Sequence, residues 1–109
     1  MHKLEVRFFK TDGGTEPVRD WLRELSASDR KTIGADIKTV QFGWPLGMPL
    51  VRKMDKDLWE VRIHLENRIA RVLFTVSNGT IVLLHGFVKK SQTTPQPDLK
   101  LATDRMRSE

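Results

Sequence analysis

Four ionisable side chains are predicted to share one face of two neighbouring strands, and their types suit phosphate chemistry. The segment LWEVRIHL places Glu60, Arg62 and His64 on the same face, because side chains alternate along a strand. The next segment, RIARVLFTV, follows a two-residue turn and brings Arg71 opposite Arg62. Guanidinium groups match phosphate oxygens, and histidine is the side-chain type that titrates near neutral pH. The set therefore combines anion binding with acid–base chemistry.

The two arginines would repel each other if nothing lay between them. Their expected closeness indicates either a shared anion or the carboxylate of Glu60 between the two guanidinium groups. In the same register Arg71 faces Gly86, where a missing side chain would let a ligand approach the backbone. Lys90 continues this face by alternation. The stretch LHGFVKKSQTTP, from Leu84 to Pro95, is therefore predicted to line an anion pocket, with Gly86 at its floor and the lysine pair at its rim.

A simpler interpretation is an ordinary solvated face of an antiparallel sheet, in which Glu60 makes one salt bridge and His64 is a surface residue. The lysine pair would then be a solvated strand end. His85 falls on the opposite face in this register, and it is expected to be a buried, hydrogen-bonded core histidine. The histidines have no metal-ligand spacing and the chain has no cysteine, so neither a metal nor a cofactor is predicted.

Length and charge limit the class of protein. The chain has 109 residues, with 19 Lys and Arg against 14 Asp and Glu and a net charge of +5. This length fits a single domain over residues 1–109. The basic balance favours polyanionic partners such as nucleic acid, an acidic protein or a membrane surface. Neither a signal-peptide pattern nor an apolar run of membrane-spanning length is present, so a soluble cytoplasmic protein is expected.

The elements that must position the ionisable face follow a simple order. Apolar residues at helical spacing predict two helices, one led by Pro17 and the next ended by Gly43. The order β-α-α-β-β-β predicts an α+β fold, in which an antiparallel sheet carries two N-terminal helices on one face. Strands are expected at residues 4–10, around Leu50–Met54, and at 58–65, 68–76 and 80–88, with a short helix in the tail from Pro97 to Glu109.

The span from Gly43 to Pro95 resembles the RelE/HigB toxins of bacterial type II toxin–antitoxin systems, especially the phage-derived HigB-like branch. The resemblance rests on GWPLGMPLVRKMDKD, DLWEVRI, RIARVLF and IVLLHGFVKKSQTTP, and it extends over nearly the whole chain. It implies a sheet backed by two helices and a toxin that enters the ribosomal A site and cleaves mRNA. It also implies a HigA-like helix-turn-helix antitoxin as partner, with operator DNA bound only through the toxin–antitoxin complex.

In these toxins the working residues are basic and lie on the sheet face opposite the helices. Position by position, the resemblance assigns them to Arg62, Arg71 and Lys90, the residues that strand alternation also groups. RelE-type members carry a tyrosine near the C-terminus that contributes to cleavage, whereas this chain has no tyrosine. Other HigB-like members use histidine and acidic residues, for which His64 and Glu60 are the stand-ins here.

Cleavage of RNA by its own 2′-hydroxyl needs a base, cations that stabilise the phosphorane and an acid for the leaving 5′-oxygen. Arg62 and Arg71 suit the cation role. His64 is the candidate acid or base, Glu60 a base or an orienter of an arginine, and Lys90 an acid or a substrate ligand. No metal is required. Four further cations are predicted to contact phosphates of mRNA or ribosomal RNA: Arg52, Lys53, Lys56 and Lys89.

Two other functions compete with mRNA cleavage. A ParE-like toxin would share the fold and inhibit DNA gyrase, but it would not need the arginine–lysine set. A non-catalytic basic module would bind RNA or an acidic protein, and the missing tyrosine favours it. If cleavage is the function, Arg71→Ala is expected to abolish it in a protein that still folds.

Overall fold

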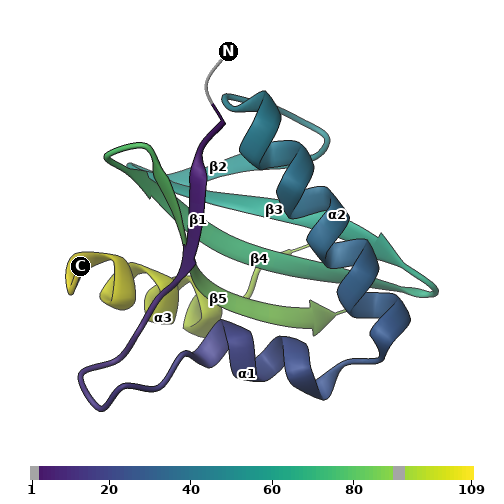
Figure 1. The fold of residues 1–109 in the computed structure, drawn as a ribbon, viewed down its shortest axis with the longest axis horizontal. Helices are drawn as coiled ribbons and strands as arrows, with labels where there is room; N and C mark the ends of the chain where they lie inside the picture. The colour runs from purple at the N-terminus through teal and green to yellow at the C-terminus, as the bar shows by residue number, and fades with distance from the viewer. Residues whose placement is uncertain (1–2, 90–92) are drawn as a thin grey trace.

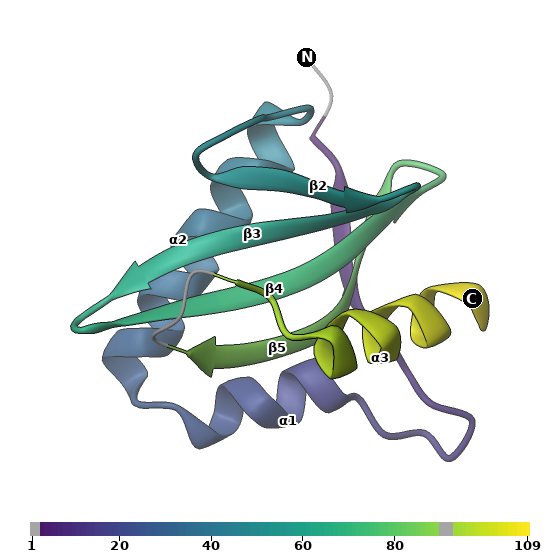
Figure 2. The same ribbon diagram turned by 180° about the vertical axis from the view of Figure 1, so that it is seen from behind.

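A single five-stranded sheet carries the other elements in this computed structural model, which describes residues 3–89 and 93–109 (Figure 1). The elements are β1 (Glu5–Phe8), α1 (Pro17–Glu24), α2 (Ala27–Gly43), β2 (Val51–Asp55), β3 (Leu58–Leu65), β4 (Arg68–Ser77), β5 (Thr80–Lys89) and α3 (Gln96–Arg107). The strands lie in the order β1-β5-β4-β3-β2. α1 and α2 cover one face of the sheet, and α3 packs on the other (Figures 1 and 2).

The predicted α+β class is confirmed, and the two N-terminal helices lie on one face as expected. Two features differ from the expectation. β1 pairs in parallel with β5, so the sheet is mixed. The two helices and three strands between β1 and β5 give the crossover length that a parallel pair needs. The tail helix α3 also packs on the sheet, so the face opposite α1 and α2 is partly covered.

Helix α2 is fixed at its N-terminal end by two side-chain contacts. The side chain of Ser26 accepts a hydrogen bond from the backbone N–H of Asp29 at 3.1 Å, which caps the first turn. The carboxylate of Asp29 also accepts a hydrogen bond from Arg68 at 2.8 Å, and this ion pair joins α2 to the start of β4. α2 is therefore held across the sheet, close to the β3–β4 hairpin.

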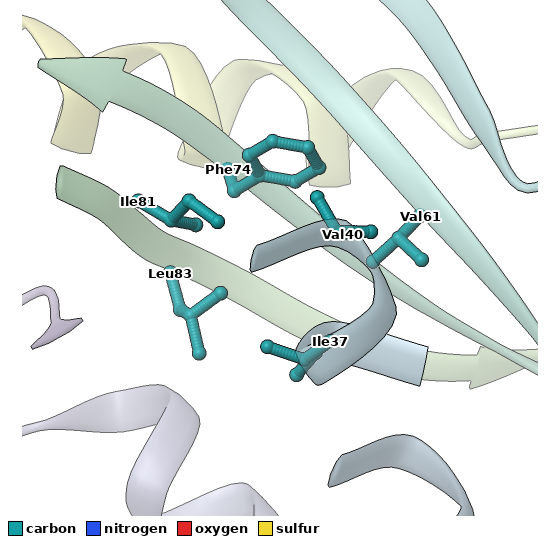
Figure 3. A pocket seen from close by; sticks show the side chains of 6 residues that line it. All are labelled: Ile37, Val40, Val61, Phe74, Ile81 and Leu83. Atoms are coloured by element: carbon teal, nitrogen blue, oxygen red, sulfur yellow. The ribbon is translucent and has the colours of Figure 1, made fainter. Parts of the chain in front are cut away.

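Apolar side chains fill the space between α2 and the sheet and leave no void large enough for water (Figure 3). Burial of each such side chain contributes roughly 1.5–3 kcal/mol. Trp44 packs edge-on against Trp59 with ring centroids 4.9 Å apart, and both rings pack against the core. The side chains that converge here are Ile37, Val40, Val61, Phe74, Ile81 and Leu83.

A second, smaller core lies under α3. Ala102 of α3 is fully buried against the sheet, and Leu99 and Met106 pack beside it. The guanidinium of Arg105 donates a hydrogen bond to the backbone oxygen of Leu84 at 2.7 Å. These contacts attach α3 to the sheet at its middle and at its C-terminal end.

The predicted pairing of β3 with β4 is confirmed over the positions that matter for the ionisable face. Arg62 lies opposite Arg71, Glu60 opposite Leu73, and His64 opposite Ile69. This register follows from the two-residue turn at Glu66 and Asn67, and Asn67 adopts a positive φ of 58°. The alternation of apolar and polar residues in β3 was therefore sufficient to place these side chains.

The predicted pairing of β4 with β5 is correct only up to Phe74, which lies opposite Leu83. A bulge follows, because Leu73 pairs with His85 and leaves Leu84 as an extra residue on β5. Beyond the bulge, the predicted pairing of Arg71 with Gly86 is wrong, and so is the predicted face of His85. Arg71 lies opposite Phe87, and Val72 lies opposite Gly86.

The bulge turns His85 and Gly86 to the faces opposite those predicted. His85 is a hydrogen-bonded, largely buried histidine as expected, but its Nε2 lies 2.7 Å from the carboxylate of Asp98 in α3. Gly86 faces α1, where a Cβ atom would lie 2.4 Å from the ring of Trp21. The missing side chain at Gly86 therefore makes room for a tryptophan, and it does not floor an anion pocket.

The variant Gly86→Ala is expected to lower the free energy of unfolding by about 1–3 kcal/mol, because Trp21 must move away from the new methyl group. Urea unfolding followed by tryptophan fluorescence measures this change. The matched control is Gly34→Ala on the outer side of α2, where nothing lies within 4 Å of the added Cβ. The control is expected to raise stability by about 0.5–1 kcal/mol. A Gly86→Ala protein as stable as the wild type would contradict the close packing.

Candidate functional site

A buried carboxylate lies at the centre of the ionisable face. The side chain of Glu60 is fully buried, and its Oε1 accepts a hydrogen bond from Nε of Arg62 at 3.0 Å. The same oxygen lies 3.8 Å from Nη1 of Arg71, which is also fully buried. The carboxylate thus lies between the two opposed arginines, which is one of the two arrangements that their predicted repulsion required.

Thr94 completes this cluster from a distant part of the sequence. Its hydroxyl donates a hydrogen bond to Oε2 of Glu60 and accepts one from Nη1 of Arg71 at 3.0 Å. The short segment before α3 crosses over β4, which brings Thr94 onto the sheet (Figure 2). The sequence offered a run of small polar residues here, but nothing in it indicated which hydroxyl would reach the carboxylate. We call Glu60, Arg62, Arg71 and Thr94 the carboxylate cluster.

Burial changes the electrostatics of Arg71. Loss of water lowers the pKa of its guanidinium below the ordinary value, the carboxylate of Glu60 opposes this shift, and the positive charge of Arg62 adds to it. Arg71 is covered in this structure, whereas the sequence predicted that it would contact a phosphate at the surface. Its charge instead balances Glu60 inside the protein. Removing it would leave that carboxylate with fewer counter-charges, so Arg71→Ala is a test of folding as well as of chemistry.

Other predicted residues remain at the surface. Arg62 keeps 13% of its side chain exposed, and His64 is exposed two residues further along the same face of β3. The two Cβ atoms are therefore about 7 Å apart. Lys89 and His64 both flank Ile69 in the sheet, and they are separated by about 10 Å across two strand spacings. His64 and Lys89 are thus two exposed side chains on the ionisable face, next to the carboxylate cluster.

The remaining predicted cations lie around β2. Arg52 is exposed and pairs with Glu60, so it lies on the ionisable face beside the carboxylate cluster. Lys53 pairs with Trp59, which puts its exposed side chain on the opposite face, and Lys56 is exposed in the turn between β2 and β3. The structure therefore separates the four predicted phosphate contacts. Lys90 lies outside the described residues.

The arrangement is suited to binding a phosphate at one guanidinium. Arg62 is fixed by its bond to a buried carboxylate, so the group is oriented before any ligand arrives. His64 supplies a titratable group on the same face. Within residues 3–89 and 93–109, no three acidic or histidine side chains lie close enough together to hold a metal ion. Over the same residues, no helix has the length and apolar character needed to cross a membrane.

Comparison with known proteins agrees with this fold. Residues 20–107 match a family described as "Phage derived protein Gp49-like (DUF891)". The match runs from within α1 to the end of α3 and includes the whole carboxylate cluster. This family is part of the toxin–antitoxin-associated group of RelE/HigB-like toxins. No curated protein matches the chain.

Replacing Thr94 with valine is expected to lower the free energy of unfolding by about 1–3 kcal/mol, because Glu60 and Arg71 each lose a buried hydrogen bond. The variant keeps the shape of the side chain, so the loss reports the hydroxyl. Thr39→Val is the control, since its hydroxyl is exposed and bonds only within α2. Urea unfolding of both variants measures the difference, and equal stability of the two would show that the Thr94 hydroxyl contributes nothing.

Proposed function

We propose that this chain, which belongs to the phage-derived Gp49-like family, is the toxin of a type II toxin–antitoxin system and cleaves mRNA on the translating ribosome. The family supports a toxin-like role in general terms, and the chemistry of cleavage is the finer part of the proposal. The observation that carries it is the guanidinium of Arg62, held at the surface by the buried carboxylate of Glu60 beside an exposed His64.

The residues of the site take different roles in the proposed reaction. Arg62 binds the scissile phosphate and stabilises the negative charge that develops as the 2′-hydroxyl attacks. His64 exchanges a proton with the attacking or the leaving oxygen. Glu60 orients Arg62, because both of its oxygens are already engaged and it is shielded from solvent. Arg71 places its positive charge 3.8 Å from Oε1 of Glu60 in the interior. Lys90 is retained as a proposed substrate ligand or acid.

Exposed cations outside the carboxylate cluster would contact the backbone of a substrate as large as a ribosome-bound RNA. Phosphate contacts from exposed lysines and arginines add affinity without sequence preference and weaken as salt concentration rises. We assign this role to Arg52, Lys53, Lys56 and Lys89, which are all exposed. Exposed cations would also suit an acidic segment of a HigA-like antitoxin, through which the pair would reach its operator DNA. The proposed site of action is the cytoplasm.

One observation favours a second candidate, a basic module that binds RNA or protein without cleaving it. Two of the predicted reactive side chains, Glu60 and Arg71, are fully buried and lie within ion-pair distance of each other. A structural ion-pair cluster would look the same. The two functions differ in whether RNA is cut, which makes cleavage the decisive measurement.

In a translating bacterial extract, the protein is expected to produce mRNA cuts at A-site codons that primer extension maps. The same RNA without ribosomes is expected to remain intact, because the ribosome positions the 2′-hydroxyl for attack. Cuts in both reactions would show a ribosome-independent nuclease. Intact RNA in both would redirect the assignment, to gyrase inhibition if the protein arrests growth in cells and to a binding module if it does not.

The variants Arg62→Gln and His64→Asn are each expected to reduce the rate of cleavage by about 100-fold or more. The first removes the positive charge that stabilises the phosphorane, and the second removes the side chain that transfers a proton. Arg19→Gln is the matched control, since this exposed arginine lies on α1. Thermal unfolding of each variant reports folding separately. Full activity in a folded Arg62→Gln protein would remove the residue from the mechanism.

A further inference from the structure

A hollow of about 300 Å³ opens beside the carboxylate cluster, at the edge of the sheet. It lies between the first half of α2, the loop that leads into β2, and the end of β3. Its volume is within the range of sites that bind small molecules. The lining residues are Thr32, Asp36, Pro49, Leu50, Arg62 and His64.

The sheet edge along this hollow is open. β2 pairs with β3 only as far as Val61, and the N–H of Arg62 donates to the backbone oxygen of Leu50 at 3.0 Å. Beyond that bond β3 continues past the start of β2, as Figure 2 shows. Backbone groups alternate along an antiparallel strand, so the N–H and C=O of His64 point to the same open side as those of Arg62. The hollow therefore contains a backbone donor and a backbone acceptor at its wall.

Asp36 gives the hollow its chemical character. Its side chain is half-buried, and it makes no hydrogen bond or ion pair with any residue that the structure describes. Asp29, two turns earlier in α2, is by contrast paired with Arg68. The hydroxyl of Thr32 donates to the carbonyl of Ser28 at 3.1 Å, so its oxygen can still accept a hydrogen bond. Hydrogen-bond acceptors therefore predominate on the α2 wall.

We infer that this hollow binds a guanine base of the RNA, with Asp36 accepting hydrogen bonds from the base; the inference rests on the proposed function. A carboxylate accepts from two adjacent N–H groups, and guanine is the RNA base whose Watson–Crick edge presents such a pair, N1–H and the 2-amino group. A cationic side chain of a protein partner would also suit a carboxylate, but the guanidinium of Arg62 at the same hollow repels it. A base is neutral, and Pro49 and Leu50 offer apolar surface to its ring.

The position of Arg62 links the base to the reaction. Arg62 lines the hollow and also belongs to the carboxylate cluster. A guanosine whose base occupies the hollow therefore has its phosphate near the guanidinium that we assign to the scissile group. The hollow would select a guanosine next to the cut, and Asp36 would determine this preference without taking part in the chemistry.

Binding of free nucleotides tests the base preference without requiring cleavage. By titration calorimetry of the full chain, guanosine 5′-monophosphate is expected to bind about tenfold or more tightly than adenosine 5′-monophosphate. Asp36→Asn is expected to reduce this ratio to about twofold or less, because the amide carries donors where guanine also carries donors. Asp20→Asn, an exposed change on α1, is the control and is expected to keep the ratio of the wild type.

Two further readouts separate the inference from the proposed function. On addition of guanosine 5′-monophosphate, amide resonances of Asp36 and His64 in the wild-type protein are expected to shift; shifts confined to other regions would overturn the guanine site. Equal binding of both nucleotides, or an Asp36→Asn protein with the wild-type ratio, would also overturn it. If mRNA is cut but the cuts show no guanosine preference that depends on Asp36, the guanine site is wrong and the proposed nuclease function still holds. If the protein binds guanine selectively but does not cut mRNA, the guanine site is supported and the proposed nuclease function is wrong.

Discussion

The structure depends on one constraint, the burial of the carboxylate of Glu60. An ionised carboxylate removed from water is costly unless charged and hydrogen-bonding groups surround it. Here Arg62 and Arg71 supply the charge and Thr94 supplies a hydroxyl, so three separate parts of the chain meet at one side chain. The register of β3 on β4 and the path of the chain over β4 into α3 must both be correct for this cluster to form. The cluster thus selects one arrangement of the ionisable face.

The same constraint divides the two arginines between structure and surface. Arg71 lies in the interior, where burial lowers its pKa and its guanidinium forms an ion pair with Glu60. Arg62 binds the same carboxylate through Nε, and part of its side chain stays exposed. A guanidinium held in this way needs little reorganisation when an anion arrives, which is the property that electrostatic catalysis requires. A buried pair of opposite charges, Glu60 and Arg71, thereby orients the partly exposed guanidinium of Arg62.

Strand alternation predicted the composition of this face, because β3 has a clear period of two and a short turn that fixes its register with β4. Strand alternation did not predict how deeply these side chains are buried. Whether the face is open depends on α3, and the weak apolar pattern of the tail did not show that Ala102 would pack on the sheet. It also did not predict the bulge at Leu84, which reverses His85 and Gly86. Insertion of one residue depends on long-range packing, here of Trp21 against Gly86, and that packing has no local signature.

The cover over the sheet also determines where a large substrate approaches. α3 contacts β5 at both of its ends: Asp98 in its first turn pairs with His85, and Arg105 near its last turn bonds the carbonyl of Leu84. The helix does not extend over the hairpin between β3 and β4 (Figure 2). His64 and Lys89 lie at that clear end, Arg62 lies at the border of the covered region, and the hollow at Asp36 opens beside them. RNA that enters from the hairpin side meets the titratable group, the oriented guanidinium and the free carboxylate without any movement of α3. The burial of Arg71 is therefore compatible with a functional site, because the groups that would touch RNA are those that α3 leaves exposed.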